Sequence, residues 1–256
     1  MRSLPSKRSI SIPSRTKPCA KPSKNQLQPH RQKQWVIPPE DDAGFVYHME
    51  DVLAVYHEPC DPDRPVVCFD EHPTQLVKQV REPTFPKPGS VVKEDYHSER
   101  NGSRNLFLAC EPLGGWRTVE VSDRRTTEDW VNFIKDLVDE QYADVECIRL
   151  VLDNLNTHKP AAFYQFFPPD QAQAYLDRFE FHYTPKRGSW LNMAEIGFNV
   201  IQEQCLDRRI PDKETLRREV TAWTEQRNDA ESDVKWQFTS EDARAKLHQL
   251  YPSIED

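Results

Sequence analysis

The alternation of apolar and polar positions predicts a sheet in the first half of the chain body. The run Pro65–Asp70 is apolar up to a final carboxylate, which is typical of a buried strand that ends on an aspartate. Two further strands are predicted at Asn105–Cys110 and Trp116–Val121, on either side of the Pro-Leu-Gly-Gly turn at 112–115. We therefore expect these three strands to form an antiparallel meander.

A helix and another apolar strand follow, and together they predict a parallel crossover. Thr127 is placed to cap a helix whose apolar positions, from Trp130 to Val138, recur at helical spacing. The run Cys147–Asp153 is again a continuous apolar strand that ends on an aspartate. Asp70 and Asp153 are therefore expected at the ends of neighbouring strands.

The last part of the chain is predicted to be mostly helical, with one more strand at Phe179–Tyr183. Helices are expected near 161–167, 170–178, 213–228 and 240–250. The clearest helical stripe steps by three and four residues through Leu191, Ala194, Phe198, Ile201 and Cys205. Glu195 borders this stripe near the helix start. The predicted order is β-β-β-α-β-α-β-α, which is an α/β fold.

Charge divides the chain of 256 residues into two parts. Residues 1–39 hold nine Lys or Arg, no acidic residue and seven of the 21 prolines, whereas residues 40–256 carry a net charge of −17. We interpret 1–39 as a basic, Pro-rich arm that does not fold alone, and 40–256 as a compact domain. Such an arm suits a polyanionic partner, although a solvated tail without a specific partner explains the charge equally well.

Composition excludes several classes of protein. The mean hydropathy is −0.81, and no apolar run approaches the ~18 residues of a membrane span. With only seven glycines, the chain has no Gly-rich phosphate-binding motif. The six cysteines are scattered without zinc-site spacing, and no secretory signal follows the basic start. We expect free thiols and a cytoplasmic location.

Three carboxylates on three predicted elements suggest metal chemistry. Asp70, Asp153 and Glu195 could clamp two divalent ions ~3.5–4 Å apart for phosphoryl transfer. At ~4 Å and an effective dielectric constant near 20, each carboxylate pair repels by roughly 4 kcal/mol, so bound cations would have to offset the repulsion. Simpler explanations also stand: a turn residue at Asp70, an Asx turn at Asp153, and a capping box from Asn192 to Glu195.

Four segments of the chain resemble DDE transposases of the mariner-related superfamily, specifically the bacterial insertion-sequence family 630. These segments are 66–71, 100–107, 150–158 and 183–195, and order and context match over 45–227. The resemblance implies a ribonuclease-H-like mixed sheet with flanking helices. It also implies that Asp70, Asp153 and Glu195 are the catalytic residues and bind Mg²⁺, with Mn²⁺ as a substitute. Double-stranded DNA, as element ends and target, would be the partner, and a homodimer is compatible with it.

The chain departs from the family pattern in two places. Asp153 and Glu195 are separated by 41 residues, more than in most relatives, which indicates an inserted helical segment around 163–176. Such transposases normally begin with helix-turn-helix modules, yet only 22–38 resembles the end of that region, and four prolines before residue 23 disfavour a full module. A truncated copy or a separately encoded recognition half would explain this departure.

Residues near the three carboxylates are candidates for DNA contact. Lys186 and Arg187 precede the Glu195 helix and could hold a DNA backbone, and Trp190 could stack on an unpaired base. A solvated loop and core packing are the plainer explanations for them. His158 could touch phosphate but is more typical of a structural histidine. Glu71 should point away from Asp70, so we leave it out of the site.

The sequence thus predicts a transposase catalytic domain that cleaves DNA with a metal ion and transfers the cut strand. Two alternatives remain open. One is a truncated, non-catalytic derivative that binds DNA or regulates a transposase. The other is a ribonuclease-H-like nuclease that cuts DNA without joining it.

Overall fold

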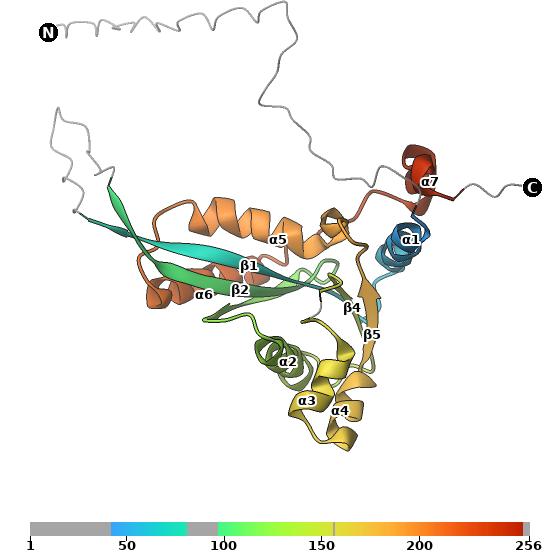
Figure 1. Ribbon diagram of the computed structural model, residues 1–256, viewed down its shortest axis with the longest axis horizontal. Coiled ribbons are helices and arrows are strands. Elements are labelled where there is room, and N and C mark those ends of the chain that lie inside the picture. Colours follow the sequence, from blue (N-terminus) through green and yellow to red (C-terminus); the bar gives the residue numbers. More distant parts are fainter. Residues whose placement is uncertain (1–41, 81–96, 156, 253–256) are drawn as a thin grey trace, which may run out of the picture. The chain divides into compact units, whose positions relative to one another are not determined.

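Five strands form one mixed sheet in the computed structural model, which describes residues 42–80, 97–155 and 157–252. The strand order is β3-β2-β1-β4-β5 (Figure 1). The strands are β1 (Val66–Gln79), β2 (Ser98–Glu111), β3 (Trp116–Ser122), β4 (Ile148–Leu152) and β5 (Phe179–Tyr183). β1, β2 and β3 pair antiparallel, whereas β4 runs parallel to β1 and to β5. The predicted meander and parallel crossover are confirmed.

The first strand is much longer than predicted, so Asp70 does not lie at its end. β1 continues for nine residues past Asp70, paired to β2 throughout most of that length. What stops near Asp70 is the pairing with β4, which is seen only from Val66 to Cys68. Beyond that point β1 has a strand neighbour on one side only. All its side chains there except Leu76 are exposed or half-buried, so the sequence loses its apolar character although the strand persists.

Helices cover both faces of the sheet, and most were predicted within a few residues. The principal helices are α1 (Ala43–His57), α2 (Thr127–Asp136), α3 (Phe163–Phe166), α4 (Pro169–Leu176), α5 (Met193–Ile201), α6 (Lys213–Asp229) and α7 (Ser240–Lys246). Short π-helical turns extend two of them, η2 (Leu137–Gln141) after α2 and η5 (Gln202–Leu206) after α5. Short 3-10 turns make up the rest, at η3 (Pro160–Ala162), η4 (Ser189–Leu191) and η6 (His248–Leu250).

Two helix starts differ from the sequence predictions. The cap of α2 is Thr126 rather than Thr127, because the Thr126 side chain accepts from the Asp129 amide while Asp129 bonds back to Thr126, closing a capping box. The helix α1 was not predicted. Its signal was nevertheless present, since Asp42 accepts from the Phe45 amide and the buried positions between Phe45 and Tyr56 recur at helical spacing.

The sheet separates two apolar clusters. One gathers side chains from α1, α5, α6 and α7, and the other from α2, α3 and α4 (Figure 1). Along β1 the side chains alternate between them: Cys68 belongs to the α5 cluster, while Val67 and Phe69 belong to the α2 cluster. By the same alternation, Asp70 faces the α5 side and Glu71 the α2 side.

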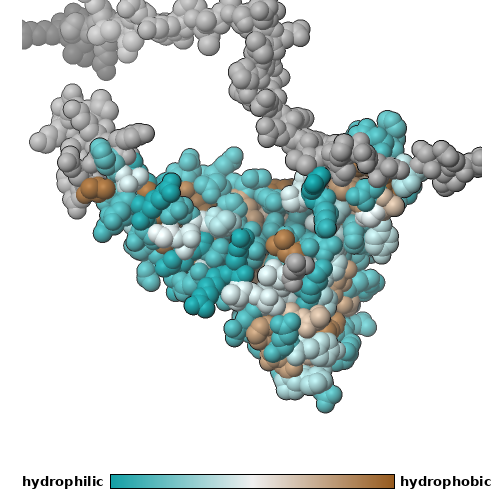
Figure 2. Space-filling view, in the orientation of Figure 1, coloured by the Kyte–Doolittle hydropathy of each residue, from teal (hydrophilic) through white to brown (hydrophobic). Residues whose placement is uncertain are grey.

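The surface shows no extended apolar area on the face drawn in Figure 2, where brown side chains are scattered among teal ones. In the described part of the chain, no helix has both the length and the apolar character to cross a membrane. The five described cysteines are free thiols, as predicted, and Cys19 lies outside the described residues. The predicted arm at 1–39 also lies outside them.

Candidate active site

Asp70 lies inside β1, opposite Leu108 of β2, with only 8% of its surface exposed. Its Oδ1 accepts a hydrogen bond from the Glu71 amide at 2.8 Å. Burial, and to a smaller extent the charges of Asp153 and Glu195, together raise the pKa of Asp70 to about 7, against the lowering effects of the Glu71 amide and His158. The three predicted carboxylates are therefore close enough for Asp70 to feel the charges of the other two.

Asp153 follows directly on the last residue of β4. The parallel register pairs Cys68 with Val151, and two more residues in the same register bring Asp70 level with Asp153. The Asp153 carboxylate is half-buried, and its Oδ1 lies 2.6 Å from Nδ1 of His158. The pairing of β1 with β4 is thus what aligns two aspartates that are 83 positions apart in the chain.

Glu195 lies in the first turn of α5 and is half-buried. The capping-box alternative is not what the structure shows. Asn192 is the N-cap and accepts from the Ala194 amide at 3.1 Å, but its own amide donates to the Ser189 carbonyl at 2.8 Å. Because that amide is already used by a backbone partner, the Glu195 side chain is not engaged in a reciprocal cap.

Asn192 connects the Glu195 helix to the strand that carries Asp70. Its side-chain amide donates to the Phe69 carbonyl at 2.8 Å, and the residue is 1% exposed. Tyr56 of α1 holds the same region, since its hydroxyl donates to the Leu191 carbonyl at 2.8 Å and accepts from the Met193 amide at 3.3 Å. The sequence pattern around Asn192 indicates only a cap, because nothing in it points to a partner 123 residues away.

We predict that Asn192→Ala lowers the free energy of unfolding by about 2–3 kcal/mol, because it removes a cap and leaves the buried Phe69 carbonyl unpaired. Asn192→Ser keeps a capping oxygen but loses the bond to Phe69, so its loss should be smaller, about 1–2 kcal/mol. Urea unfolding of the two variants beside the wild type measures both effects. Equal stability of all three proteins would show that this connection contributes nothing.

The donor set fits a divalent cation on chemical grounds. Carboxylate oxygens are the ligands that Mg²⁺ prefers, and the mutual repulsion that raises the Asp70 pKa is what a bound cation would offset. Within residues 42–80, 97–155 and 157–252, however, no group of three or more His, Cys, Asp or Glu side chains is drawn together tightly enough to hold a metal ion. The carboxylates would have to close further around a cation.

His158 and Glu71 lie beside these carboxylates on the α2 side of the sheet. His158 is fully buried, and its Nε2 lies 3.6 Å from Oε2 of Glu71. Burial lowers the pKa of His158, but the interactions with Asp153 and Glu71 outweigh it and raise the pKa to about 9. Glu71 points away from Asp70, as expected, yet it reaches the group that contacts Asp153. No local sequence pattern predicts this connection.

The candidate DNA-contact residues share the loop between β5 and α5. Lys186 and Arg187 are exposed, and Arg187 adopts a left-handed backbone with φ 64°. The next residue has to be Gly188, since a Cβ there would lie 2.5 Å from Cγ of Pro185. Trp190 is half-buried and packs against Trp236 and Phe238, at ring-centroid distances of 6.5 and 5.8 Å. These contacts are those of core packing.

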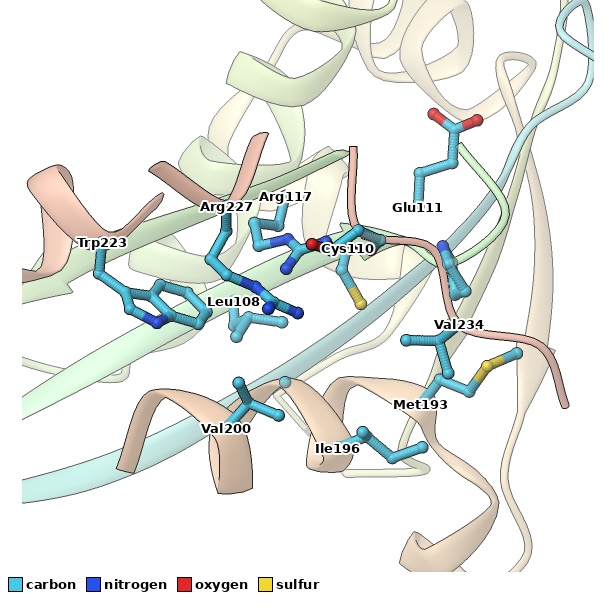
Figure 3. Close-up of a pocket in the computed structure, with 13 residues that line it drawn as sticks. Leu108, Cys110, Glu111, Arg117, Met193, Ile196, Val200, Trp223, Arg227 and Val234 are labelled. Carbon is cyan, nitrogen blue, oxygen red and sulfur yellow. Dashed lines mark hydrogen bonds between the residues drawn. The ribbon is translucent and has the colours of Figure 1, made fainter. Parts of the chain in front are cut away.

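An apolar pocket lies apart from the carboxylates. It is formed between β2, β3, α5 and α6, and Figure 3 shows Arg117 and Arg227 beside Leu108, Cys110 and Trp223. Arg117 donates to the carbonyls of Gly115 and Ser232. None of Asp70, Asp153 and Glu195 lines this pocket. Arg117 thus connects loops on the α6 side, away from the three carboxylates.

The five-stranded mixed sheet with helices on both faces is the architecture of a ribonuclease-H-like domain. A sequence model of the family described as DDE superfamily endonuclease matches residues 65–217, and the chain belongs to that family. The match confirms the predicted resemblance to DDE transposases of the mariner-related type. A comparison with curated proteins found no match.

Solved structures of Mos1 mariner transposase have the same fold. The paired end complex with Mn is 13% identical, with a TM-score of 0.50 over 82% of this chain and 64% of that chain. The strand transfer complex is also 13% identical, with a TM-score of 0.53 over 89% of this chain and 63% of that chain. The present chain thus spans less than two thirds of the Mos1 chains in these two complexes. At this identity the likeness concerns the fold, and it confirms the predicted ribonuclease-H-like mixed sheet.

Proposed function

We propose that this chain cleaves DNA and transfers the cut strand, with Asp70, Asp153 and Glu195 as the catalytic, metal-binding residues. The observation that carries the proposal is the register of β1 and β4, which brings the buried Asp70 level with Asp153. The charges of Asp153 and Glu195, besides burial, raise the pKa of Asp70, as expected for acids that lie near one another. Families of phosphoryl-transfer enzymes use such converging carboxylates to bind divalent ions.

The proposed reaction has two steps at one site. Water first attacks the phosphodiester at the element end, and the bond to the 3′ oxygen breaks to leave a free 3′-hydroxyl and a 5′-phosphate. That hydroxyl then attacks a target phosphodiester and displaces another 3′-hydroxyl, so each step exchanges one P–O bond for another. Bound Mg²⁺ or Mn²⁺ would supply charge stabilisation at the reacting phosphate.

The chain's own residues supply the remaining functions. Asp70, Asp153 and Glu195 would hold the cations from β1, the end of β4 and the start of α5. Lys186 and Arg187 are exposed on the loop before α5, where they could bind the phosphates of the cleaved strand. Trp190 would contribute base stacking only if it left its contacts with Trp236 and Phe238, so we assign that role to it last.

The proposed partners are the two ends of a mobile element and a target duplex. The Mos1 structures with the same fold are described as paired end and strand transfer complexes, which motivates this part of the proposal. Two DNA ends held together would call for two copies of the chain, so we include a homodimer on DNA in the proposal.

Incubation of the full chain with supercoiled plasmid tests the proposal. We expect nicked and linear products with Mg²⁺ or Mn²⁺ and none with EDTA, because the carboxylates alone do not activate water. Labelled oligonucleotides with free 3′ ends should be joined to the plasmid. Nicking without joining would indicate a nuclease that lacks strand transfer. DNA binding without any cutting would indicate a non-catalytic derivative and would overturn the proposal.

A further inference from the structure

We propose that His158 is a positioning residue that, together with Glu71, holds the Asp153 carboxylate in place for metal binding. The inference rests on the proposed function and adds two residues to the site. The juxtaposition behind it is a chain of three side chains, Asp153, His158 and Glu71, which connects the end of β4 to β1.

The histidine is held more rigidly than the carboxylate it contacts. Its ring is fully buried, stacks on Trp130 at a centroid distance of 5.5 Å and 29°, and meets the edge of Phe69 at 5.3 Å and 84°. Trp130 and Phe69 are themselves fully buried in the cluster on the α2 side. An imidazole between two such rings cannot rotate freely, so its two nitrogens point in set directions.

Asp153 needs such a support because no strand pairing reaches it. β4 ends at Leu152, and its pairing with β5 ends there too. The 2.6 Å contact from Nδ1 of His158 to Oδ1 of Asp153 fixes one carboxylate oxygen. The other oxygen, Oδ2, would then be the one offered to a cation. A carboxylate that is held before metal binding loses less side-chain entropy when the ion arrives.

Glu71 completes the support from the strand that carries Asp70. Its side chain is only 6% exposed and lies between Nε2 of His158, at 3.6 Å, and Nη1 of Arg125, at 3.4 Å. Glu71 is adjacent to Asp70 in β1. The contacts from Asp153 through His158 to Glu71 therefore couple the position of Asp153 to the strand that carries Asp70. When a side chain that hydrogen-bonds a metal-binding residue is removed, metal affinity commonly falls about 10–100-fold.

A second buried histidine–aspartate pair provides a matched control. His182 of β5 is 8% exposed, and its Nδ1 lies 2.9 Å from Oδ2 of Asp51 on α1. This pair resembles the His158 pair in burial and geometry but involves none of the three site carboxylates. Removing the imidazole of His182 should therefore cost stability without affecting the metal site.

Calorimetric titration with Mn²⁺ and thermal unfolding of four proteins test the inference. The proteins are the wild type, His158→Leu, His158→Asn and His182→Leu. We expect His158→Leu to weaken Mn²⁺ binding about 10-fold or more. His158→Asn, whose amide nitrogen replaces Nδ1, should remain within about threefold of the wild type. His182→Leu should bind Mn²⁺ normally despite a comparable fall in Tm.

Two results would overturn the inference while leaving the proposed function intact. One is wild-type Mn²⁺ affinity in His158→Leu. The other is an equal loss of Mn²⁺ affinity in both His158 variants, in proportion to the fall in their Tm. That result would mean that His158 is a purely structural residue. If His158→Leu does not fold, Glu71→Gln replaces it and should weaken Mn²⁺ binding in the same direction. A wild-type protein that neither binds Mn²⁺ nor cuts plasmid would instead overturn the proposed function, and the inference with it.

Discussion

Replacing Glu195 or Asp153 with alanine is expected to reduce Mg²⁺-dependent plasmid cleavage at least about a thousandfold, because on the order of 4 kcal/mol of transition-state stabilisation is lost. The Glu195 side chain is half-buried near a helix start, so the Tm of Glu195→Ala should change by no more than about 3 °C. Asp153→Ala should lower the Tm more, because it leaves the buried imidazole of His158 without its partner. Initial rates of nicking, measured beside thermal unfolding, check both parts.

Glu203→Ala is the matched control for the Glu195 variant, because Glu203 is an exposed glutamate in η5, the continuation of the same helix. It should leave both cleavage and Tm unchanged. If Glu195→Ala retained activity but lost several degrees in Tm, Glu195 would be a structural residue of α5 and the proposed metal site would be wrong.

The second large effect concerns the free energy of unfolding of the metal-free protein. Most mutations at a buried site lower it, but this one should raise it. Asp70→Asn should stabilise the metal-free protein at pH 8. The pKa of Asp70 is about 7 in the folded chain, against its ordinary value of 3.8, mainly because of burial. Because the folded chain binds the Asp70 proton more tightly than the unfolded chain does, protonated Asp70 contributes stability that is fully present below about pH 4. This contribution is lost as the pH rises through 7.

The magnitude follows from the size of the shift. At 1.36 kcal/mol per pKa unit, the ionised wild-type carboxylate costs up to about 4 kcal/mol at pH 8. Asparagine keeps the Oδ1 that accepts from the Glu71 amide but carries no charge. Urea unfolding in EDTA should therefore show a gain for Asp70→Asn at pH 8 that nearly vanishes at pH 4. Saturating Mn²⁺ should reduce the gain, because it stabilises only the wild type.

Asp207→Asn is the control for this experiment, since Asp207 is exposed and its replacement should give the same small difference at both pH values. Loss of stability in Asp70→Asn at pH 8 would mean that Asp70 is ionised and favourably paired in the folded protein. A gain of equal size at pH 4 and pH 8 would mean that the effect is one of packing rather than charge.

Local sequence patterns were sufficient for most of the sheet. β5 was predicted residue for residue, and β3 and β4 to within one or two residues, because each is a short apolar or alternating run bounded by turn or helix signals. The same reasoning predicted a β1 that was too short. Its outer half pairs with β2 while exposing polar side chains, so backbone hydrogen bonds to a neighbour keep it a strand where hydrophobicity no longer marks one.

The sequence by itself determined the element order from β1 onward, the separation of charge along the chain and the three carboxylates worth considering, because these depend on residue type and on spacing within one element. Only the tertiary structure decided that Asp70 lies level with Asp153, that Asn192 connects α5 to Phe69, and that His158 lies between Asp153 and Glu71. The physical reason is that these contacts join residues brought together by strand register and side-chain packing. Neither leaves a periodic mark in the local sequence.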